Sequence, residues 1–315
     1  MILVTGSNGF VGSALCATLR ARGVGVRAAV RKSATNEQVN VGDLNGGTDW
    51  RLALAGCSTV IHLAARVHVM ADTEQDPMRA YREVNVDATM NLARQAVQAG
   101  VRRLVFVSSV KVNGEATHAQ PFRSADIPMP GDPYGQSKLE AEQALQQYAR
   151  ETGLEVVIVR PPLVYGPGVK ANFLNLMKLV RLGAPLPFGS IKNYRSMVAL
   201  ANLVDLLIVC TTHPSAPGEV FMVSDGHDLN TADLVRMIAN AMRRRLWLVP
   251  VPPWLLAGAA KLVGKASIAD RLLGTLQVDI ENTQAKLKWE PVMAPQAAID
   301  QTVAHFLQQN AGRNQ

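Results

Sequence analysis

A tyrosine and a lysine four residues apart, Tyr134 and Lys138, carry the clearest chemical signal in the chain. On a helix, residues at this spacing share one face, and Asp132 followed by Pro133 is a typical helix start. A phenol has a pKa of about 10, and a neighbouring ammonium group favours the phenolate and lowers that pKa. We therefore expect Tyr134 to exchange a proton with a substrate oxygen, and Ser109 to hydrogen-bond the same oxygen.

The beginning of the chain predicts a phosphate site. Residues 2–4 are typical of a buried strand and residues 13–20 of a helix. Glycines between them permit positive φ and close approach of a ligand, and a helix amino end attracts anions. Their spacing is a variant of the dinucleotide fingerprint; the alternative is a structural turn without a ligand. The predicted cofactor contacts are Gly6, Ser7, Asn8, Gly9, Phe10, Val11 and Gly12.

The residues after the second predicted strand indicate which dinucleotide is bound. An acidic side chain there would hold the ribose of NAD, whereas a cation would hold the extra phosphate of NADP. The strand ends in Arg31 and Lys32, with no carboxylate before Glu37, and arginine binds phosphate through two N–H groups. We predict NADP(H), with NAD and a pair of solvated cations as the alternatives. Asp43, next to Leu44, either accepts from the adenine amino group or caps a turn.

Strand and helix signals alternate through the first half of the chain, which predicts a doubly wound α/β fold with a parallel sheet. Ligands bind such sheets at the carboxyl ends of the strands. Ala64 and Ala65, small residues at one such end, suit a backbone that passes close to a cofactor, while His62 is interpreted as a core residue. The predicted strands are 2–4, 24–30, 39–41, 60–65, 104–108 and 154–159, and the predicted helices are 13–20, 84–99 and 133–151.

Composition argues against several classes of protein. Of 315 residues, 48% are hydrophobic and 18% charged, enough for one large domain or two joined ones. A net charge of +7 without a long basic run, and only 5% aromatic residues, argue against a nucleic-acid surface. Three scattered cysteines and a strand starting at residue 2 predict a cytoplasmic protein without a metal site or signal peptide. The apolar stretch 246–264 is too short and too proline-rich to span a membrane.

The chain resembles, over nearly its whole length, the extended short-chain dehydrogenase/reductases of the nucleotide-sugar epimerase/dehydratase group. The segments that carry the resemblance are 5–12, 62–65, 85–86, 108–109, 134–138, 160–161 and 164–168. It implies a Rossmann domain that binds NADP and a smaller, mostly C-terminal domain that binds a nucleotide sugar. The first would comprise 1–165 and about 190–225, and the second about 166–189 and 226–315.

The resemblance also implies roles for individual residues. Ser109, Tyr134 and Lys138 would form the catalytic triad, with Lys138 also holding the nicotinamide ribose. Pro161 and Val164 would line the nicotinamide end. Further contacts to the cofactor would come from Leu63, Ala64 and Ala65, and contacts to the UDP-sugar from Ser109, Asn172, Phe188, Arg195 and Arg271.

Several of these residues also have simpler interpretations. Asn172 matches a position at the sugar-nucleotide diphosphate but could instead cap a helix. Phe188 lies in a segment similar to the one beside the uracil but could pack in the core. Arg195 would meet the diphosphate but could form a surface pair. Trp247 and Trp254, in a proline-rich stretch, are interpreted as packing residues.

Two departures from the family fall near the expected sugar pocket, so the identity of the hexose is not predicted. The family often has the sequence Val-Tyr-Gly after the strand of the catalytic serine, and here Asn113 replaces the tyrosine. The second departure is Lys111. No Asp-Glu pair follows Ser109, which argues against 4,6-dehydration.

The choice of reaction depends on the cofactor. An epimerase of this family retains NAD, whereas a reductase binds reduced cofactor in each turnover, commonly NADPH. Arg31 and Lys32 therefore favour NADPH-dependent reduction of a UDP-4-keto-6-deoxy-N-acetylhexosamine to UDP-N-acetylquinovosamine or UDP-N-acetylfucosamine, for O-antigen synthesis. The alternatives are a UDP-hexose 4-epimerase and a non-catalytic NADP-binding redox sensor, which would not need the intact triad. Homodimers through the helix carrying Tyr134 are common in the family.

Overall fold

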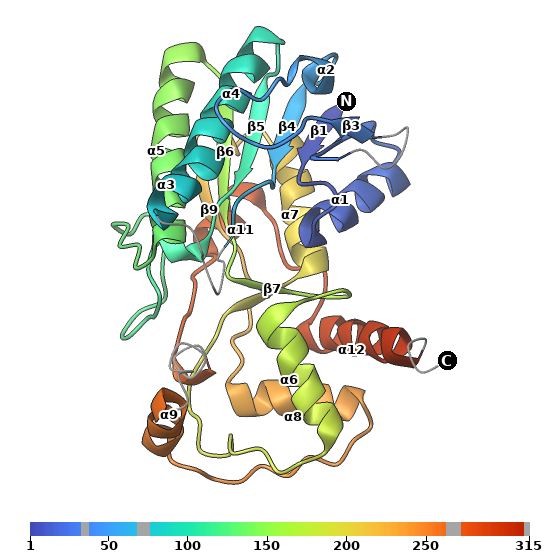
Figure 1. The fold of residues 1–315 in the computed structure, drawn as a ribbon, viewed down its shortest axis with the longest axis vertical. Coiled ribbons are helices and arrows are strands. Elements are labelled where there is room, and N and C mark those ends of the chain that lie inside the picture. The colour runs from blue at the N-terminus through green and yellow to red at the C-terminus, as the bar shows by residue number, and fades with distance from the viewer. Residues whose placement is uncertain (33–37, 68–75, 263–271, 312–315) are drawn as a thin grey trace.

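The computed structural model describes residues 1–32, 38–67, 76–262 and 272–311, and a seven-stranded sheet forms its upper lobe (Figure 1). All neighbouring strands of this sheet pair in parallel, in the order β3-β2-β1-β4-β5-β6-β9. The strands are β1 Ile2–Thr5, β2 Val26–Val30, β3 Gln38–Asn40, β4 Thr59–His62, β5 Arg103–Val107, β6 Glu155–Arg160 and β9 Val220–Met222. The predicted α/β fold class is confirmed.

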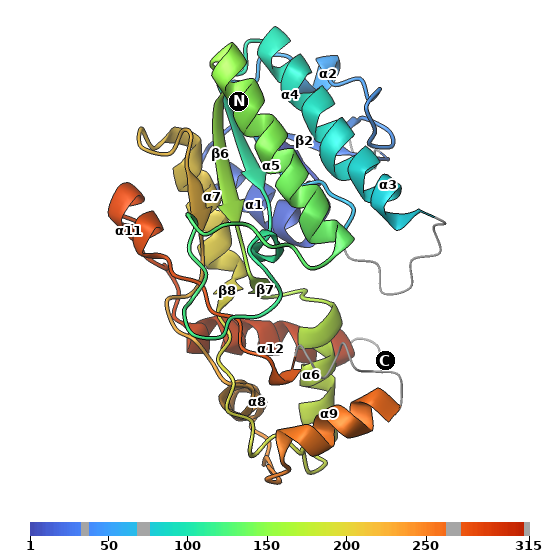
Figure 2. The ribbon, with the colours of Figure 1, turned by 90° about the vertical axis from the view of Figure 1, so that its left-hand side faces the viewer.

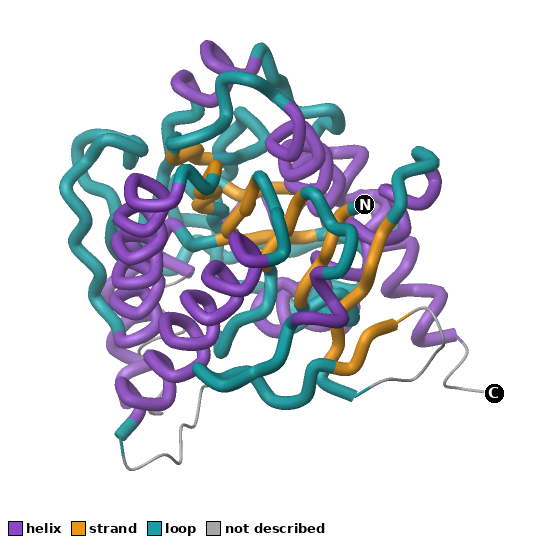
Figure 3. The backbone as a smooth tube through the Cα atoms, turned by 90° about the horizontal axis from the view of Figure 1, so that it is seen from above, coloured by secondary structure: helices purple, strands orange, loops and turns teal. Residues whose placement is uncertain are grey.

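Helices cover both faces of the sheet, as the view from above shows (Figure 3). Because alternate residues of a strand point to opposite faces, Leu3 joins one core and Val4 the other. The core around Val4 is closed by α1 (Phe10–Ala21), α7 (Leu200–Thr212) and α11 (Glu281–Leu287). The core around Leu3 is closed by α2 (Arg51–Leu54), α4 (Ala88–Gln98) and α5 (Pro133–Thr152).

A second lobe with its own apolar core lies below the carboxyl edge of the sheet (Figures 1 and 2). Two short parallel strands, β7 (Leu163–Tyr165) and β8 (Met197–Ala199), connect the lobes. The helices of the second lobe are α6 (Ala171–Leu182), α8 (Thr231–Ala241), α9 (Pro253–Leu262) and α12 (Pro295–Ala311). The predicted residue limits of the two domains stay a prediction.

Several predicted boundaries differ from the structure. The fourth strand ends at His62, and residues 63–67 form a loop. The predicted helix 84–99 belongs to a longer run of α3 (Pro77–Arg82), a π-helical turn η1 (Glu83–Asp87) and α4. The strand β9 was not predicted, because three residues are too few to show a periodic pattern.

The interpretation of Trp247 and Trp254 as packing residues is wrong. Their side chains are 68% and 71% exposed. Leu246 and Leu248 pack against the core of the second lobe, and in this extended segment the residue between them must point to the opposite side. No helix in the described part of the chain is long and apolar enough to cross a membrane.

Candidate active site

The glycine loop between β1 and α1 has the shape of a phosphate cradle. Gly6 has a φ of +64°, and a Cβ atom there would lie 3.0 Å from the backbone nitrogen of Ala64. A Cβ atom on Gly12 would lie 2.2 Å from the carbonyl oxygen of Gly6. Gly9 caps α1, and the first turn has neither a side-chain cap nor an acidic residue. The free N–H groups of this turn therefore fit the pyrophosphate of a dinucleotide.

Side-chain hydrogen bonds fix the glycine loop to the neighbouring strands. Ser7, a predicted cofactor contact, is buried, and its hydroxyl donates to the carbonyl oxygen of Ala29 over 2.9 Å. The hydroxyl oxygen of Thr5 accepts from the backbone N–H groups of Leu63 and Ala64. The loop after β4, where we predicted cofactor contacts, is thereby fixed against β1.

His62 has a structural role in the same network. The hydroxyl of Thr89 donates to the carbonyl oxygen of Asn85 over 2.8 Å and so accepts from Nε2 of His62 over 3.0 Å. Nδ1 of His62 then accepts from Thr5 over 2.7 Å. Burial, and secondly the charge of Lys138, lower the pKa of His62 to about 3. His62 is therefore a neutral core residue, as expected, and it orders the loop that follows β4.

The structure brings Ser109, Tyr134 and Lys138 together at the carboxyl end of β5. Asp132 caps α5 by accepting from the backbone N–H of Gly135 over 2.7 Å, which fixes the first turn that carries Tyr134. The hydroxyl of Ser109 faces that of Tyr134 and lowers the pKa of the phenol. Ser109 Oγ accepts from the backbone N–H of Lys111 over 3.2 Å, which fixes the serine side chain beside the tyrosine.

Lys138 is buried below the tyrosine. Its Nζ donates to the carbonyl oxygen of Val107 over 2.8 Å and lies 4.3 Å from the centre of the Phe106 ring. Burial lowers the pKa of Lys138 to about 7, although the carboxylate of Glu142 opposes this shift. The ammonium group is therefore held against β5 by a carbonyl and an aromatic ring.

The pKa of Tyr134 is raised, so the expectation that it would be lowered is wrong. Burial is the largest cause that raises the pKa of Tyr134 to about 12; Asp132 and Tyr81 add to the rise, and the hydrogen bond from Ser109 opposes it. Spacing along a helix predicted that Lys138 would lie nearby, but it could not show the loss of hydration of the phenol. In this structure Tyr134 is protonated at neutral pH.

Asn85 lies beside the candidate site, and no role was predicted for it from the sequence. It lies fully buried in the π-helical turn η1, and such turns are frequent at functional sites. Its amide accepts from the N–H of Arg66 over 2.8 Å and donates to the carbonyl of Arg66 over 3.0 Å. It also donates to Oγ of Ser137 over 2.9 Å, and that hydroxyl donates to the carbonyl of Tyr134. Asn85 thus joins the loop after β4 to the tyrosine turn.

Asn113 and Lys111, the two departures from the family, form hydrogen bonds and ion pairs within the protein. Asn113 is buried, accepts from Arg160 over 3.0 Å and donates to the carbonyl of Arg123. Arg160 also forms a two-point ion pair with Glu142 of α5. Asn113 therefore joins the loop after β5 to β6 and α5, instead of facing a sugar pocket. Lys111 forms ion pairs with Asp132, the N-cap of α5, and with Glu115 in the loop after β5.

The predicted determinants of cofactor choice lie at the surface. Arg31 and Lys32 follow directly after β2 and are exposed. Asp43 is exposed too, but the neighbouring turns are closed by Asn40 and Asn45, whose side-chain oxygens accept from Gly42 and Gly47. Leu44 packs against the core around Leu3.

Apart from Ser109 and Arg271, the predicted substrate residues lie in or beside the second lobe. Asn172 is in the first turn of α6, which Lys170 precedes as the N-cap, so Asn172 is not the helix cap. Phe188 is buried in the second core. Arg195 pairs with Leu229 through its backbone and donates from Nη1 to the carbonyl of Gly274 over 3.1 Å. Arg271 lies outside the described residues.

Two predicted cofactor residues follow β6. The carbonyl oxygen of Pro161 accepts from the N–H of Val110 over 3.0 Å, which joins β6 to the loop carrying Ser109. Val164 is half-buried in β7.

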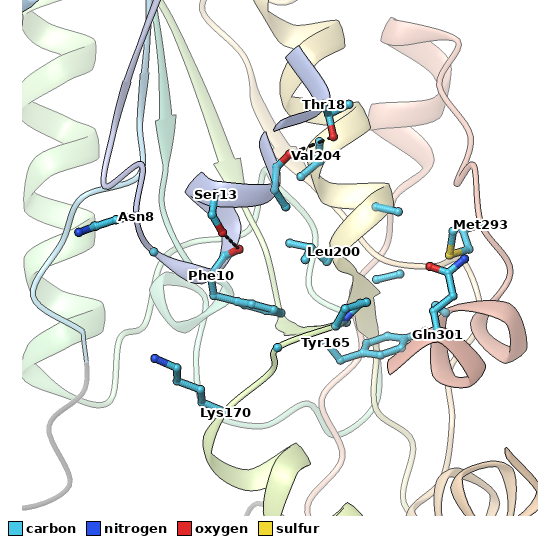
Figure 4. Close-up of a pocket in the computed structure, with 18 residues that line it drawn as sticks. Asn8, Phe10, Ser13, Thr18, Tyr165, Lys170, Leu200, Val204, Met293 and Gln301 are labelled. Carbon is cyan, nitrogen blue, oxygen red and sulfur yellow. Dashed lines mark hydrogen bonds between the residues drawn. The ribbon is translucent and has the colours of Figure 1, made fainter. Parts of the chain in front are cut away.

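A cavity of about 610 Å³ lies on the other side of the glycine loop, between α1, α7 and α12 (Figure 4). Phe10 points into it toward Tyr165, and Asn8 and Gly9 line its edge. Neither Tyr134 nor Lys138 lines this cavity. It is therefore separate from the catalytic groups, and no cluster of possible metal ligands occurs among the described residues.

Comparison with known proteins agrees with this geometry. Residues 2–224 match the model of the NAD dependent epimerase/dehydratase family. The chain is 50% identical to a UDP-glucose 4-epimerase of Vibrio cholerae, over 98% of this chain and 96% of that protein. It is 29% identical to the N-acetyl-α-D-glucosaminyl-diphospho-ditrans,octacis-undecaprenol 4-epimerase of Escherichia coli O157:H7, over 84% and 81% of the two chains.

A solved structure with a similar fold agrees with these sequence comparisons. MoeE5 in complex with UDP-glucose and NAD is 26% identical, with a TM-score of 0.79 over 98% of this chain and 99% of that one. The family match covers the glycine loop, the Ser109 loop and the helix of Tyr134 and Lys138. The chain therefore belongs to the NAD-dependent epimerase/dehydratase family.

Proposed function

We propose that this protein is an NAD-dependent 4-epimerase of a UDP-linked hexose. The observation that carries the proposal is its half-identical relative from Vibrio cholerae, a UDP-glucose 4-epimerase. That relative favours epimerisation over the reduction that Arg31 and Lys32 led us to expect. The glycine cradle and the Ser109, Tyr134 and Lys138 arrangement support the proposal, because oxidation and reduction of a sugar carbon need both.

The chemistry assigned to the chain is a proton transfer at the oxygen on carbon four of the sugar. In its phenolate form Tyr134 would take the proton from this hydroxyl and later return it, while Ser109 orients the oxygen. Bound NAD would supply reversible hydride transfer at carbon four, which inversion at this carbon requires. Lys138 would hold the nicotinamide ribose from below Tyr134. The Gly6 to Gly12 cradle would hold the pyrophosphate.

A second candidate is reduction of a UDP-4-keto-sugar with NADPH. One observation favours it: Arg31 and Lys32 are exposed after β2, where the extra phosphate would lie. In this reaction Tyr134 would donate its proton to the ketone oxygen. The two candidates share the triad and differ in the cofactor and in whether it stays bound.

The nucleotide that accompanies the purified protein tests this choice. We expect chromatography of the denatured protein to release NAD in near-equal molar amount. A protein that is free of nucleotide and takes up NADPH much more tightly than NADH would contradict the epimerase and support the reductase. The variant Arg31→Ser should weaken NADPH binding and leave NAD binding nearly unchanged, whichever reaction occurs.

A further inference from the structure

The end of the second lobe farthest from the sheet exposes large apolar side chains beside arginines. It is formed by the segment between α8 and α9, by α9 itself and by the end of α6, at the bottom of Figures 1 and 2. We call it the basal surface and define it by its exposed residues Leu182, Arg244, Arg245, Trp247, Val249 and Trp254. It lies outside the candidate active site.

The apolar residues of the basal surface are held in place. The N–H of Leu186 donates to the carbonyl of Trp247 over 2.8 Å, and the N–H of Val249 donates to the carbonyl of Leu186 over 2.9 Å. This pairing fixes an extended segment whose alternate residues, Leu246 and Leu248, are anchored in the core. Trp247 and Val249 are therefore presented to the outside by a supported backbone.

The charged residues of the surface follow the end of α8. Arg243 has a φ of +52°, and the N–H groups of Arg243 and Arg244 bond the carbonyls of Asn240 and Ala239. This is the helix ending that usually has glycine at the residue with positive φ. An arginine there costs stability, yet it keeps three successive arginines at one point of the surface.

The three arginines have no acidic partners within the described part of the chain. Among the described residues no carboxylate forms an ion pair with Arg243, Arg244 or Arg245, and residues 234–269 contain no Asp or Glu. A hollow of about 510 Å³ is lined by Arg236, Asn240, Arg244, Arg245, Leu246 and Leu248. Arg236 pairs with Asp233, and the guanidinium groups of Arg244 and Arg245 suit a phosphate anion.

We propose that the basal surface docks on an anionic phospholipid bilayer. Tryptophan is enriched at the boundary between headgroups and acyl chains, because its ring is apolar and its N–H is polar. Trp247 and Trp254 enter this boundary, while Arg244 and Arg245 bind headgroup phosphates. Protein interfaces are also enriched in tryptophan and arginine, but the lack of any carboxylate in residues 234–269 favours an anionic bilayer as the partner. Docking from this end leaves the carboxyl edge of the sheet open to substrate.

Intrinsic fluorescence of the full chain with lipid vesicles tests the proposal. Of the four tryptophans, Trp50 and Trp289 are buried and Trp247 and Trp254 are exposed, so a change in emission reports on the basal surface. We expect a blue shift and co-sedimentation with vesicles that contain phosphatidylglycerol, much weaker binding to pure phosphatidylcholine, and loss of binding at high salt. Equal binding to both vesicle types, or none to either, would overturn the proposal.

Charge reversal supplies a matched comparison. One arginine near an anionic surface contributes about fivefold to binding, so Arg244→Glu with Arg245→Glu should weaken vesicle binding by roughly 25-fold or more. The control Arg94→Glu with Arg150→Glu makes the same charge change on exposed residues of α4 and α5, and it should bind nearly as wild type. Equal loss in both pairs would show that only net charge matters and would contradict the proposal.

Replacement of the tryptophans distinguishes membrane docking from dimerisation or nucleic-acid binding at the basal surface. Trp247→Gln with Trp254→Gln should abolish the blue shift and weaken co-sedimentation, with unchanged sugar-nucleotide turnover. If the wild type is instead a dimer that this variant dissociates, or if a single-stranded oligonucleotide competes fully with vesicles, the surface serves another partner and the proposal fails. Should a variant not fold, the lipid and salt dependence of the wild type still decides.

Discussion

At the scale of single residues, the candidate site consists of Tyr134 and Ser109, held in place by buried neighbours. Tyr134 is protonated in this structure because its burial outweighs the hydrogen bond from Ser109. The lysine that was expected to ionise it is turned toward Val107 and Phe106. Proton transfer therefore needs the hydroxyl of Tyr134 at the substrate oxygen, and it depends on groups that hold that hydroxyl in place.

Removal of this hydroxyl tests the assignment. Tyr134→Phe should lower kcat by about 10²-fold to 10⁴-fold, the usual contribution of general acid–base catalysis, while the Kd for the dinucleotide changes little. Tyr148→Phe, on the same helix and away from Ser109, is the control and should retain full activity. Near-normal turnover by Tyr134→Phe would rule out its catalytic role.

His62 predicts a dependence of stability on pH. Its pKa is about 3 in the folded protein and about 6.5 when exposed, so between these values the unfolded chain binds a proton that the folded protein does not. The free energy of unfolding should therefore fall as the pH is lowered from about 6.5 toward 3, by at most about 1.4 kcal/mol per pH unit.

Denaturant unfolding at several pH values measures this slope. His62→Gln should be less stable at neutral pH and should lack the part of the slope that is due to His62. His118→Gln, which changes an exposed histidine, should keep the wild-type slope. An unaltered slope in His62→Gln would show that other groups cause the acid sensitivity.

At the scale of elements, the glycine loop makes a sharp prediction about cofactor binding. A methyl group at Gly12 would lie 2.2 Å from the carbonyl oxygen of Gly6, so Gly12→Ala must displace the loop from the start of α1. We expect at least a tenfold loss of dinucleotide affinity, which corresponds to about 1.4 kcal/mol, measured by calorimetry with added nucleotide.

A second helical glycine provides the comparison. Gly258 in α9 has open space around its Cβ position, and Gly258→Ala should stabilise the helix by about 0.5–1 kcal/mol and leave nucleotide affinity unchanged. Equal affinities of Gly12→Ala and wild type would mean that the loop does not form the cofactor site.

The ion pair between α5 and β6 makes a prediction about stability. Glu142 and Arg160 are buried together with Asn113, and removal of one partner leaves an uncompensated charge. Glu142→Gln should lower the free energy of unfolding by about 3–5 kcal/mol. Glu140→Gln, two residues earlier and in an exposed pair with Arg82, should cost at most about 1 kcal/mol. Similar losses in the two variants would refute the structural role of the buried pair.

At the scale of the whole molecule, a buried hydrogen-bond cluster joins the two lobes. The carboxylate of Asp225 accepts from the hydroxyl of Tyr165 in β7. It also accepts from the backbone N–H of Ala199 and from the side-chain amide of Asn202, both at the start of α7. The amide of Asn202 exchanges hydrogen bonds with the backbone of Met293 just before α12. Burial raises the pKa of Asp225, and its hydrogen bonds oppose the rise. The lobes are thus connected at the edge where substrate would bind.

Local patterns in the sequence were enough for the fold class and for the helix that carries Tyr134 and Lys138, while the catalytic roles of these residues stay a prediction. The strands of the sheet are apolar runs, and the Tyr134 helix begins with an N-cap that needs only neighbouring residues. Contacts between distant segments were not predictable: Asn113 meets Arg160, and Asn85 meets Arg66 and Ser137, only after folding. The exposure of Trp247 depends on its pairing with residue Leu186, which no local pattern indicates.

The most direct test of the proposed function follows the sugar itself. Purified protein without added nucleotide should be incubated with UDP-glucose and, separately, with UDP-N-acetylglucosamine, while proton NMR follows the configuration at carbon four. The proposal predicts an equilibrium mixture of the two carbon-four epimers for at least one substrate, with no net change in absorbance of reduced cofactor. No inversion of either sugar, together with stoichiometric consumption of NADPH by a UDP-4-keto-6-deoxy-N-acetylhexosamine, would contradict it and identify a reductase.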